Sequence, residues 1–245
     1  MNILTIANQK GGTAKSTTAA ALAQAAARQG KKTLAIDLDP QGNLSFFLKA
    51  DTSKASSLDL LEGKPLKEVA QPAGRKLDAV AASWNLQTIS SGRGSARRLK
   101  AALEPAEYDL IIIDTPPTAG ELQNNALMAA TDLIIPLQAD TVGLQGLYQM
   151  TDTARQVQKG NPALTLTGYI LTRYRANSRL VKQMTKLIKQ AADEMGIPFL
   201  GVIREAVAIQ EAQALQENLF DYSFLSNPAM DYNKLLRKVL EERKV

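Results

Sequence analysis

Residues 10–17 read Lys-Gly-Gly-Thr-Ala-Lys-Ser-Thr and lie between a short apolar run at 3–7 and an Ala-rich stretch at 15–29. The apolar run is typical of a buried strand, and the Ala-rich stretch is typical of a helix. A loop that joins a strand to a helix directs backbone N–H groups and the positive end of the helix dipole at one point, which favours a bound phosphate. The octet therefore predicts a phosphate-binding loop in an α/β fold.

The individual residues of this loop suit a nucleoside triphosphate with Mg²⁺. Gly11 and Gly12 let the backbone come close to the phosphates. Lys15 is placed to reach the β- and γ-phosphates, and the Ser16 hydroxyl is placed to bind Mg²⁺. The predicted cofactors are ATP or ADP and Mg²⁺, and the remaining residues of the expected site are Lys10, Thr13, Ala14 and Thr17.

The octet departs from the common phosphate-loop pattern, which has glycine six positions and one position before the lysine. Gln9 and Ala14 occupy these two positions. The octet fits instead the variant Lys-Gly-Gly-x-Gly-Lys-Ser/Thr, which carries an additional lysine, here Lys10. If the backbone needs a positive φ at Ala14, the alanine costs on the order of 1 kcal/mol and weakens nucleotide binding or hydrolysis. The alternative is that a small residue is tolerated there.

Composition limits the chemistry that this chain can perform. The 245 residues contain no cysteine and no histidine, which excludes thiolate catalysis, disulfides and imidazole bases. Phosphoryl transfer is compatible with the remaining side chains because it depends on positioning and charge. No apolar run approaches the roughly 20 residues that span a bilayer. The net charge of +5 is a weak indication of an anionic partner.

Apolar runs of strand length alternate with helical patterns along the chain, which predicts parallel strands joined by right-handed helical crossovers. We expect one α/β domain over 1–245, a doubly wound, mainly parallel sheet of seven or eight strands with helices on both faces. An insertion of short helices is expected at about 42–85, and no helix-turn-helix domain before the loop. The expected strands are 2–7, 33–37, 86–90, 109–114, 132–137, 165–172 and 198–203. The expected helices are 15–29, 94–103, 121–130, 143–159, 178–195, 207–217 and 229–243.

Three aspartates end two of the predicted strands. Asp37 and Asp39 are two residues apart, so their side chains share a face and are expected at the carboxyl ends of the strands, where open α/β sheets bind ligands. Asp114 follows four aliphatic residues, where a carboxylate is costly unless it meets a cation or donors. Its natural partner is Mg²⁺, together with Ser16. The alternatives are a solvated turn at 37–43 and a helix cap at Asp114.

The octet, the segment Asp-Leu-Asp-Pro-Gln-Gly-Asn at 37–43 and the segment Asp-Thr-Pro-Pro at 114–117 together resemble the ParA/Soj-type partition ATPases, within the group that also holds MinD and the nitrogenase iron protein. The resemblance implies a slow, Mg²⁺-dependent ATPase that forms an ATP-sandwich homodimer and binds DNA non-specifically. It also implies stimulation by a ParB-like centromere-binding protein, a role in segregating a plasmid, chromosome or mobile element, and a cytoplasmic, nucleoid-associated location.

The resemblance also assigns roles to single residues. It gives Asp39 the catalytic role of positioning the attacking water, places Asp37 in the metal shell, and sets Asp114 in the Walker B position. Thr17 is matched to a contact with the α-phosphate. Lys10 is matched to the signature lysine that reaches the phosphates of the partner subunit, although a lysine there also suits binding within its own subunit.

A basic stretch from 172 to 190 holds six positive charges and no acidic residue. Spacings of three and four residues place four of these cations on one helical face that suits a phosphate backbone, although such a face can also be merely solvated. Val181, Met184, Leu187 and Ile188 are expected to form the buried face. Arg204 is another candidate, with pairing to Glu205 or Glu211 as the structural alternative. The candidate DNA-binding residues are Arg175, Arg179, Lys182, Lys186, Lys189 and Arg204.

Two other functions remain open from the sequence. A MinD-like positioning ATPase would use an amphipathic terminal helix to bind membrane. The stripe of Leu236, Val239 and Leu240 favours packing against the sheet, and no stable membrane association is expected. A dethiobiotin-synthetase-like ligase would share the fold but would need neither Lys10 nor the basic stretch.

Overall fold

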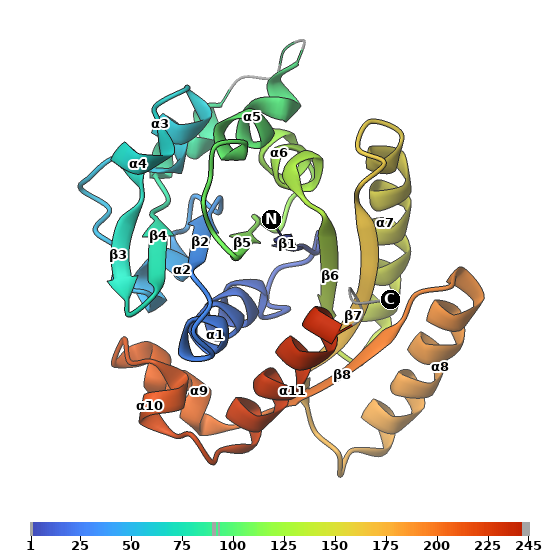
Figure 1. Ribbon diagram of the computed structural model, residues 1–245. Helices are drawn as coiled ribbons and strands as arrows, with labels where there is room; N and C mark the ends of the chain where they lie inside the picture. The colour runs from blue at the N-terminus through green and yellow to red at the C-terminus, as the bar shows by residue number, and fades with distance from the viewer. Residues whose placement is uncertain (1, 90–91, 93, 242–245) are drawn as a thin grey trace.

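The computed structural model describes residues 2–89, 92 and 94–241. One eight-stranded sheet runs through it in the order β3-β4-β2-β5-β1-β6-β7-β8. All neighbouring strands are parallel except β3 and β4, which are antiparallel. Helices cover both faces (Figure 1), which confirms the predicted doubly wound α/β fold. The strands are β1 Asn2–Ile6, β2 Thr33–Asp37, β3 Gln71–Gly74, β4 Leu77–Val80, β5 Leu110–Asp114, β6 Asp132–Leu137, β7 Thr165–Tyr174 and β8 Phe199–Arg204.

The longer helices lie close to their predicted positions. They are α1 Lys15–Arg28, α6 Glu121–Ala129, α7 Thr141–Gln158, α8 Arg179–Met195, α9 Val207–Ala214 and α11 Asn227–Glu241. The last two residues of the helix expected at 229–243 lie outside the described part of the chain. The shorter helices are α2 Asn43–Phe47, α3 Ser57–Leu61, α4 Leu66–Val69, α5 Arg98–Leu103, α10 Leu219–Tyr222 and the 3₁₀ turns η1 Trp84–Thr88 and η2 Ser95–Arg97.

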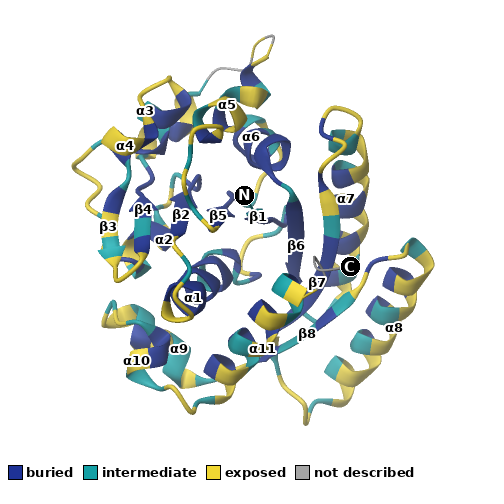
Figure 2. Ribbon diagram, in the orientation of Figure 1, coloured by how far each residue is buried: buried dark blue, intermediate teal, exposed yellow. Residues whose placement is uncertain are grey.

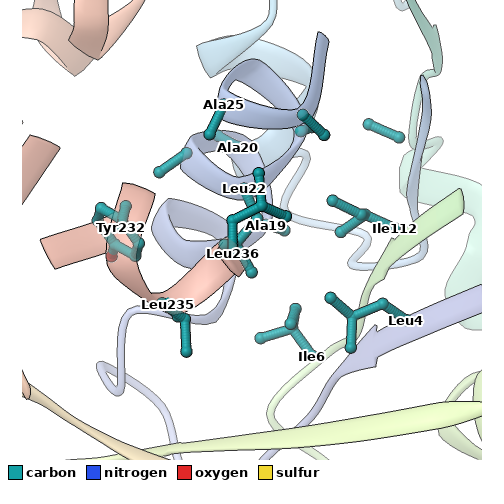
Figure 3. Close-up of a cluster of buried hydrophobic side chains, with 14 of the residues drawn as sticks. Leu4, Ile6, Ala19, Ala20, Leu22, Ala25, Ile112, Tyr232, Leu235 and Leu236 are labelled. Carbon is teal, nitrogen blue, oxygen red and sulfur yellow. The ribbon is translucent and has the colours of Figure 1, made fainter. Parts of the chain in front are cut away.

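The core forms two layers because the central strands are apolar on both faces. Helices α1, α2, α9, α10 and α11 cover one face, and α3 to α8 cover the other. In Figure 3, Leu22 of α1 and Leu236 of α11 pack over Leu4 and Ile112 of the sheet. The Ala-rich face of α1 lets this helix lie close to the strands, so the sequence of α1 fixes the position of the loop that precedes it.

Helix α11 packs into the core along its apolar stripe. Tyr232, Leu235, Leu236 and Val239 are buried against α1 and the sheet, and the Tyr232 hydroxyl lies 3.3 Å from the Thr18 hydroxyl. Packing of this stripe against the sheet is thereby confirmed for the described part of the helix. Over the same residues, 2–89, 92 and 94–241, no helix is long and apolar enough to cross a bilayer.

Two expectations in the first half of the chain are wrong. Residues 86–88 of the strand expected at 86–90 belong instead to the turn η1, in which the Ser83 hydroxyl accepts from the Asn85 N–H and Leu86 is the buried residue. Residue 90 lies outside the described residues. The region 42–85 contains the expected short helices but also β3 and β4, which the sequence analysis missed. Each of these strands has four residues, too few for a visible alternation, and β3 includes Pro72 and Gly74 at the sheet edge.

Candidate nucleotide-binding site

The candidate site is the loop from Ala7 to Ala14, which leaves the carboxyl end of β1 and enters α1. Strand β1 lies between β5 and β6 in the middle of the sheet, and its last residue, Ile6, is level with Asp114 of β5. Asp37 at the end of β2 is level with the same Asp114. Three parallel strands therefore bring the loop and both strand-end aspartates to one edge, as predicted.

Side chains from outside the loop hold its carbonyl groups. The Gln138 amide donates to the Gly12 carbonyl at 2.8 Å, and the Thr172 hydroxyl donates to the Thr13 carbonyl at 3.1 Å. No acceptor in the described part of the chain is hydrogen-bonded to the backbone N–H groups of Gly11, Gly12 or Thr13. Space lies open beside both glycines. The loop thus offers free N–H donors around an open space, which suits an anion.

Sequence reasoning missed the residues that hold this loop in place. Asn8 accepts from the Lys10 N–H at 3.1 Å and donates to the Pro136 carbonyl at 2.8 Å. Gln138 and Thr172 come from the ends of β6 and β7, more than a hundred residues away in the chain. Only the position of Asn8, two residues before the octet, offered a local signal.

Ala14 adopts the left-handed conformation, with φ 64° and ψ 35°, directly before α1. Gly12 in the same loop has φ 76°. The Cβ of an L-residue with positive φ crowds the following carbonyl, whereas glycine avoids this contact. The structure therefore meets the condition under which the alanine carries strain.

We expect Ala14→Gly to tighten ATP binding by about fivefold, equivalent to about 1 kcal/mol, because the loop conformation loses its steric strain. Titration calorimetry with a non-hydrolysable ATP analogue measures this change. The control is Ala26→Gly in the interior of α1, which lowers thermal stability by a similar energy without tightening binding. Equal affinities in Ala14→Gly and the parent would show that alanine is accommodated without penalty to the site.

The Lys15 ammonium group lies inside the loop. Lys15 is buried, and its Nζ donates to the Lys10 carbonyl at 3.1 Å. Burial lowers the pKa of this amine, and the charges of Asp114 and Asp39 oppose that shift. A phosphate group would supply the counter-charge that a buried lysine needs.

Lys10 presents a different environment. Its Nζ lies 3.9 Å from Asp140 Oδ2 in an ion pair whose members are about one third exposed. Asp140 also accepts from the Gly143 N–H and so caps α7. An exposed pair of this kind contributes at most about 1 kcal/mol, so the Lys10 ammonium can exchange this partner for a phosphate at little cost.

Asp114 fits a Mg²⁺ site. The residue is fully buried, its Oδ1 accepts from the Thr115 N–H at 3.0 Å, and its Oδ2 has no hydrogen-bond partner among the described residues. Burial and the neighbouring Asp37 raise the pKa of the Asp114 carboxyl, while the Ser16 hydroxyl and Lys15 act against that shift. A cation beside Ser16 would satisfy the orphaned oxygen.

No cluster of three acidic side chains that could hold a metal ion by itself occurs within 2–89, 92 and 94–241. A single carboxylate and a hydroxyl make a weak site for Mg²⁺, which prefers six oxygen ligands. Phosphate oxygens and water would have to complete the coordination. The residues present therefore fit a metal ion that arrives with a nucleotide.

We expect Asp114→Asn to raise the free energy of unfolding by about 1–3 kcal/mol at neutral pH without nucleotide, because it removes a fully buried carboxyl group whose ionised form is destabilised by burial and by Asp37. The same change should abolish the stabilisation that Mg²⁺ and ATP give the parent. Urea denaturation with and without the ligands measures both effects, with the exposed Asp152→Asn as control. A variant less stable than the parent without ligands, or equally stabilised by them, would contradict this assignment.

Asp37 and Asp39 form a connected pair. The Asp37 carboxylate accepts from the Asp39 N–H at 3.0 Å and from the Ser45 N–H and hydroxyl at 2.8 and 2.7 Å. Burial raises the pKa of Asp37 to about 6 in spite of these bonds. Asp39 is buried as well, and its Oδ1 accepts from the Gln41 N–H at 3.0 Å. Asp37 thus fixes the turn that carries Asp39 and stands beside Asp114.

The Thr17 hydroxyl lies in the first turn of α1 and accepts from the Gln213 amide of α9 at 2.9 Å. The sequence analysis did not connect α9 to the loop. This contact brings a second helix to the edge of the candidate site.

The candidate DNA-binding cations are not equivalent. Arg179, Lys182 and Lys186 are exposed along α8, on the outer side of the molecule (Figure 2). Lys189 Nζ lies 4.1 Å from the centre of the Phe199 ring. Leu187 is 49% exposed, so its assignment to the buried face is wrong.

Two arginines near the cations of α8 form ion pairs with carboxylates. Arg175 pairs with Glu205. Arg204 pairs through two nitrogens with Asp231 of α11, its NH2 group lying 2.7 Å from Asp231 Oδ1. The sequence analysis gave Glu205 or Glu211 as the alternative ion-pair partner of Arg204, and both of these assignments are wrong. Nothing local in the sequence joins Arg204 to a residue 27 positions later.

A strand–loop–helix unit with a free amide cradle, a buried lysine and strand-end aspartates defines a P-loop nucleotide-binding protein. The chain belongs to the AAA_31 family (AAA domain), which matches residues 1–166, and to the Soj/ParA group of partition ATPases. It is 34% identical to the chromosome-partitioning ATPase Soj of Thermus thermophilus over 244 residues, covering 97% of this chain and 94% of that protein.

Two solved structures illustrate the range of proteins with this fold. An ATP complex of McdA from Cyanothece has a TM-score of 0.85 and 28% identity, covering 100% of this chain and 97% of that one. Cobyrinic acid a,c-diamide synthase from Mycobacterium smegmatis, with bound ADP and magnesium, has a TM-score of 0.83 and 30% identity, covering 100% and 96%. The sheet and its helices are thus shared by proteins with different names and activities.

Proposed function

We propose that this chain is a partition ATPase that binds Mg²⁺ and ATP, forms a homodimer around the nucleotide, binds DNA and segregates a plasmid, a chromosome or a mobile element. The observation that supports this most is the amide cradle with buried Lys15 beside the orphaned Asp114 oxygen, in a chain 34% identical to Soj. The test is release of phosphate from ATP by the purified protein, with and without Mg²⁺ and DNA. Absence of turnover under all these conditions would contradict the proposal.

In the proposed mechanism, Lys15 and the loop N–H groups bind the phosphates and neutralise charge on the leaving group. Ser16 and Asp114 hold Mg²⁺, which supplies charge stabilisation at the phosphates when bound. Asp39 orients the attacking water. Asp37 keeps Asp39 in position and belongs to the metal shell. Thr17 contacts the α-phosphate after its bond to Gln213 opens.

Lys10 has the proposed role of completing the partner's site. Its side chain is partly exposed, and its ammonium group is held by a weak ion pair with Asp140, so it can reach beyond its own subunit. An ammonium group supplied by the partner stabilises charge that develops between the β- and γ-phosphates. Hydrolysis would then depend on the dimer, which links the nucleotide state to assembly.

The proposed DNA surface is the outer side of α8 with the loop before it. Arg179, Lys182 and Lys186 are exposed there and have no carboxylate partner among the described residues. Cations without internal partners can replace the counterions of a phosphate backbone without reading sequence. Arg175 and Arg204 would first have to leave Glu205 and Asp231, so we give them a smaller part.

We expect the double change Lys182→Glu and Lys186→Glu to weaken ATP-dependent binding to duplex DNA by more than about tenfold, because two phosphate contacts become repulsive. The slope of log affinity against log salt should fall by about 0.9 for each lost contact. Fluorescence anisotropy with two unrelated DNA sequences measures both, and Lys54→Glu is the control. Unchanged DNA affinity in the variant, or a parent affinity that does not depend on salt, would contradict DNA binding by α8.

A ParB-like centromere-binding protein is the proposed partner, and slow turnover would rise when it is added together with DNA. The proposed location is the bacterial cytoplasm, on the nucleoid. Both follow from the relatives named Soj and ParA, together with the cationic surface of α8. Fluorescence microscopy of the tagged chain beside a nucleoid stain tests the location.

A MinD-like role at a membrane is less well supported, because the apolar stripe of α11 is already buried against α1 and β8. Sedimentation with anionic liposomes in the presence of ATP tests it. The ligase alternative has one supporting observation, the likeness to a cobyrinic acid a,c-diamide synthase. ATP turnover that appears only with an added carboxylate metabolite, and does not change with DNA, would favour the ligase.

A further inference from the structure

A large groove lies at the edge of the sheet opposite the candidate nucleotide site. Its volume is about 1310 Å³, and it runs between the α3–α4 turn, α5 and the turn that leads into β5. Lys32, which precedes β2, and Tyr108, which precedes β5, line it, so it opens at the amino ends of the strands. Helices α3, α4 and α5, which line the groove, lie together in Figure 1 and away from α8 and α11.

The floor of the groove is apolar. Leu60 and Leu61 at the end of α3 and Leu66 of α4 are buried beneath it, and the exposed residues Pro65, Ala101 and Pro105 supply its accessible apolar surface. Ala102 of α5 and the Tyr108 ring continue this floor. The Tyr108 hydroxyl donates to Asp78 of β4 at 2.8 Å, which anchors this wall to the sheet. The floor is therefore a fixed part of the core and does not depend on a mobile loop.

The rim carries an excess of positive charge. Four cations line the groove, Lys32, Lys64, Lys67 and Arg98, against the two carboxylates of Glu62 and Glu107. Lys64 lies 4.0 Å from Asp59, and Lys32 lies over the Tyr108 ring at 5.0 Å. Lys67 and Arg98 have no carboxylate partner within residues 2–89, 92 and 94–241.

We propose that this groove is a docking site for an acidic, amphipathic helical segment of a protein partner. Apolar side chains on one face of such a helix would contact Pro65, Ala101 and Pro105. Carboxylates beside them would pair with Lys67 and Arg98. A lipid surface suits the groove less well, because a flat bilayer does not enter a concavity.

The groove is connected to the candidate active site through α3. Ser57, the first residue of α3, donates from its hydroxyl to the Asp37 carbonyl at 2.6 Å and from its N–H to the Ala81 carbonyl at 2.8 Å. Leu60 and Leu61 at the other end of this helix form the groove floor. A helix bound in the groove would therefore restrain the segment that positions Asp37 and Asp39.

The test uses a helical peptide of about 15 residues with leucine on one face and glutamate beside it, and a matched peptide with lysine in place of glutamate. Fluorescence anisotropy on the full chain measures binding. Hydrogen exchange locates the peptide, with protection expected at 60–67 and 101–108. The variants are Lys67→Glu with Arg98→Glu, which reverses the rim charge, and Ala101→Trp, which fills the groove. Lys100→Glu, on α5 but outside the groove, is the control.

We expect the acidic peptide to bind, the basic peptide to fail, and both variants to lower affinity by about tenfold or more while the control does not. Thermal melting confirms that each variant folds. Absence of binding to the parent, equal binding by the variants, or protection by anionic vesicles in place of peptide would overturn the proposal. Binding here does not require ATP hydrolysis, so this result and the test of the proposed function are separate.

Discussion

Lys10→Ala should lose ATP-dependent dimerisation and lower ATP turnover by on the order of 10³-fold, the range found for a cation supplied in trans to a phosphoryl group. The physical reason is that no other cation of the loop is free. Lys15 is buried inside its own subunit, whereas the Lys10 ammonium is held by an exposed ion pair with Asp140. Sedimentation velocity with Mg²⁺ and a non-hydrolysable ATP analogue should show the parent at about twice 26.5 kDa and the variant as monomer.

Binding of ATP to the monomer separates this role from binding within one subunit. The Lys10→Ala monomer should keep ATP affinity within about threefold of the parent monomer. The reason is that the phosphates of an ATP bound in one subunit contact Lys15 and the loop N–H groups of that same subunit. Lys100→Ala removes a lysine away from the site and serves as the control. If Lys10→Ala dimerises normally, or loses ATP affinity by orders of magnitude, Lys10 acts within its own subunit.

Asp39→Ala should separate assembly from hydrolysis. The variant should bind ATP and dimerise like the parent but lower turnover by about 10²–10⁴-fold, because it removes the group that orients water and leaves the phosphate cradle intact. Asp39 is buried at the strand edge, where its Oδ1 accepts from the Gln41 N–H. A quenched assay of phosphate release measures turnover, and sedimentation velocity on the same samples measures dimerisation.

The control for Asp39 is Asp51→Ala, which removes an exposed carboxylate in the turn after α2 and should leave turnover unchanged. A variant of Asp39 that hydrolyses ATP at the parent rate would transfer the water-positioning role to another group. A variant that no longer dimerises would show that Asp39 acts in assembly.

The sequence was sufficient to predict the centre of the fold and most of the candidate site. The octet at 10–17 is a local strand–loop–helix signal, and the strand-end aspartates follow long apolar runs, so both can be read without tertiary information. Parallel pairing of β1, β2 and β5 then brings Asp37 and Asp114 to the same edge. Even the strain at Ala14 follows from one departure from the loop pattern.

The remaining features depend on contacts between distant segments. The hairpin of β3 and β4 is too short for its pattern to be visible, and its position is set by pairing with β2. The supports of the loop, Gln138 and Thr172, and the partner of Arg204, Asp231, are chosen by tertiary proximity. Leu187 follows the helical spacing of the apolar residues but lies outside the face of α8 that packs against the protein. Periodicity alone therefore assigned it wrongly to the buried face.

A crystal structure with Mg²⁺ and a non-hydrolysable ATP analogue tests the central claim most directly. The account predicts triphosphate bound by the N–H groups of 11–16 and Mg²⁺ at Ser16 beside Asp114. It also predicts a two-fold related subunit whose Lys10 ammonium has left Asp140 and contacts the phosphates across the interface. An empty loop, or a filled loop with Lys10 on its own phosphates and no facing subunit, would contradict it.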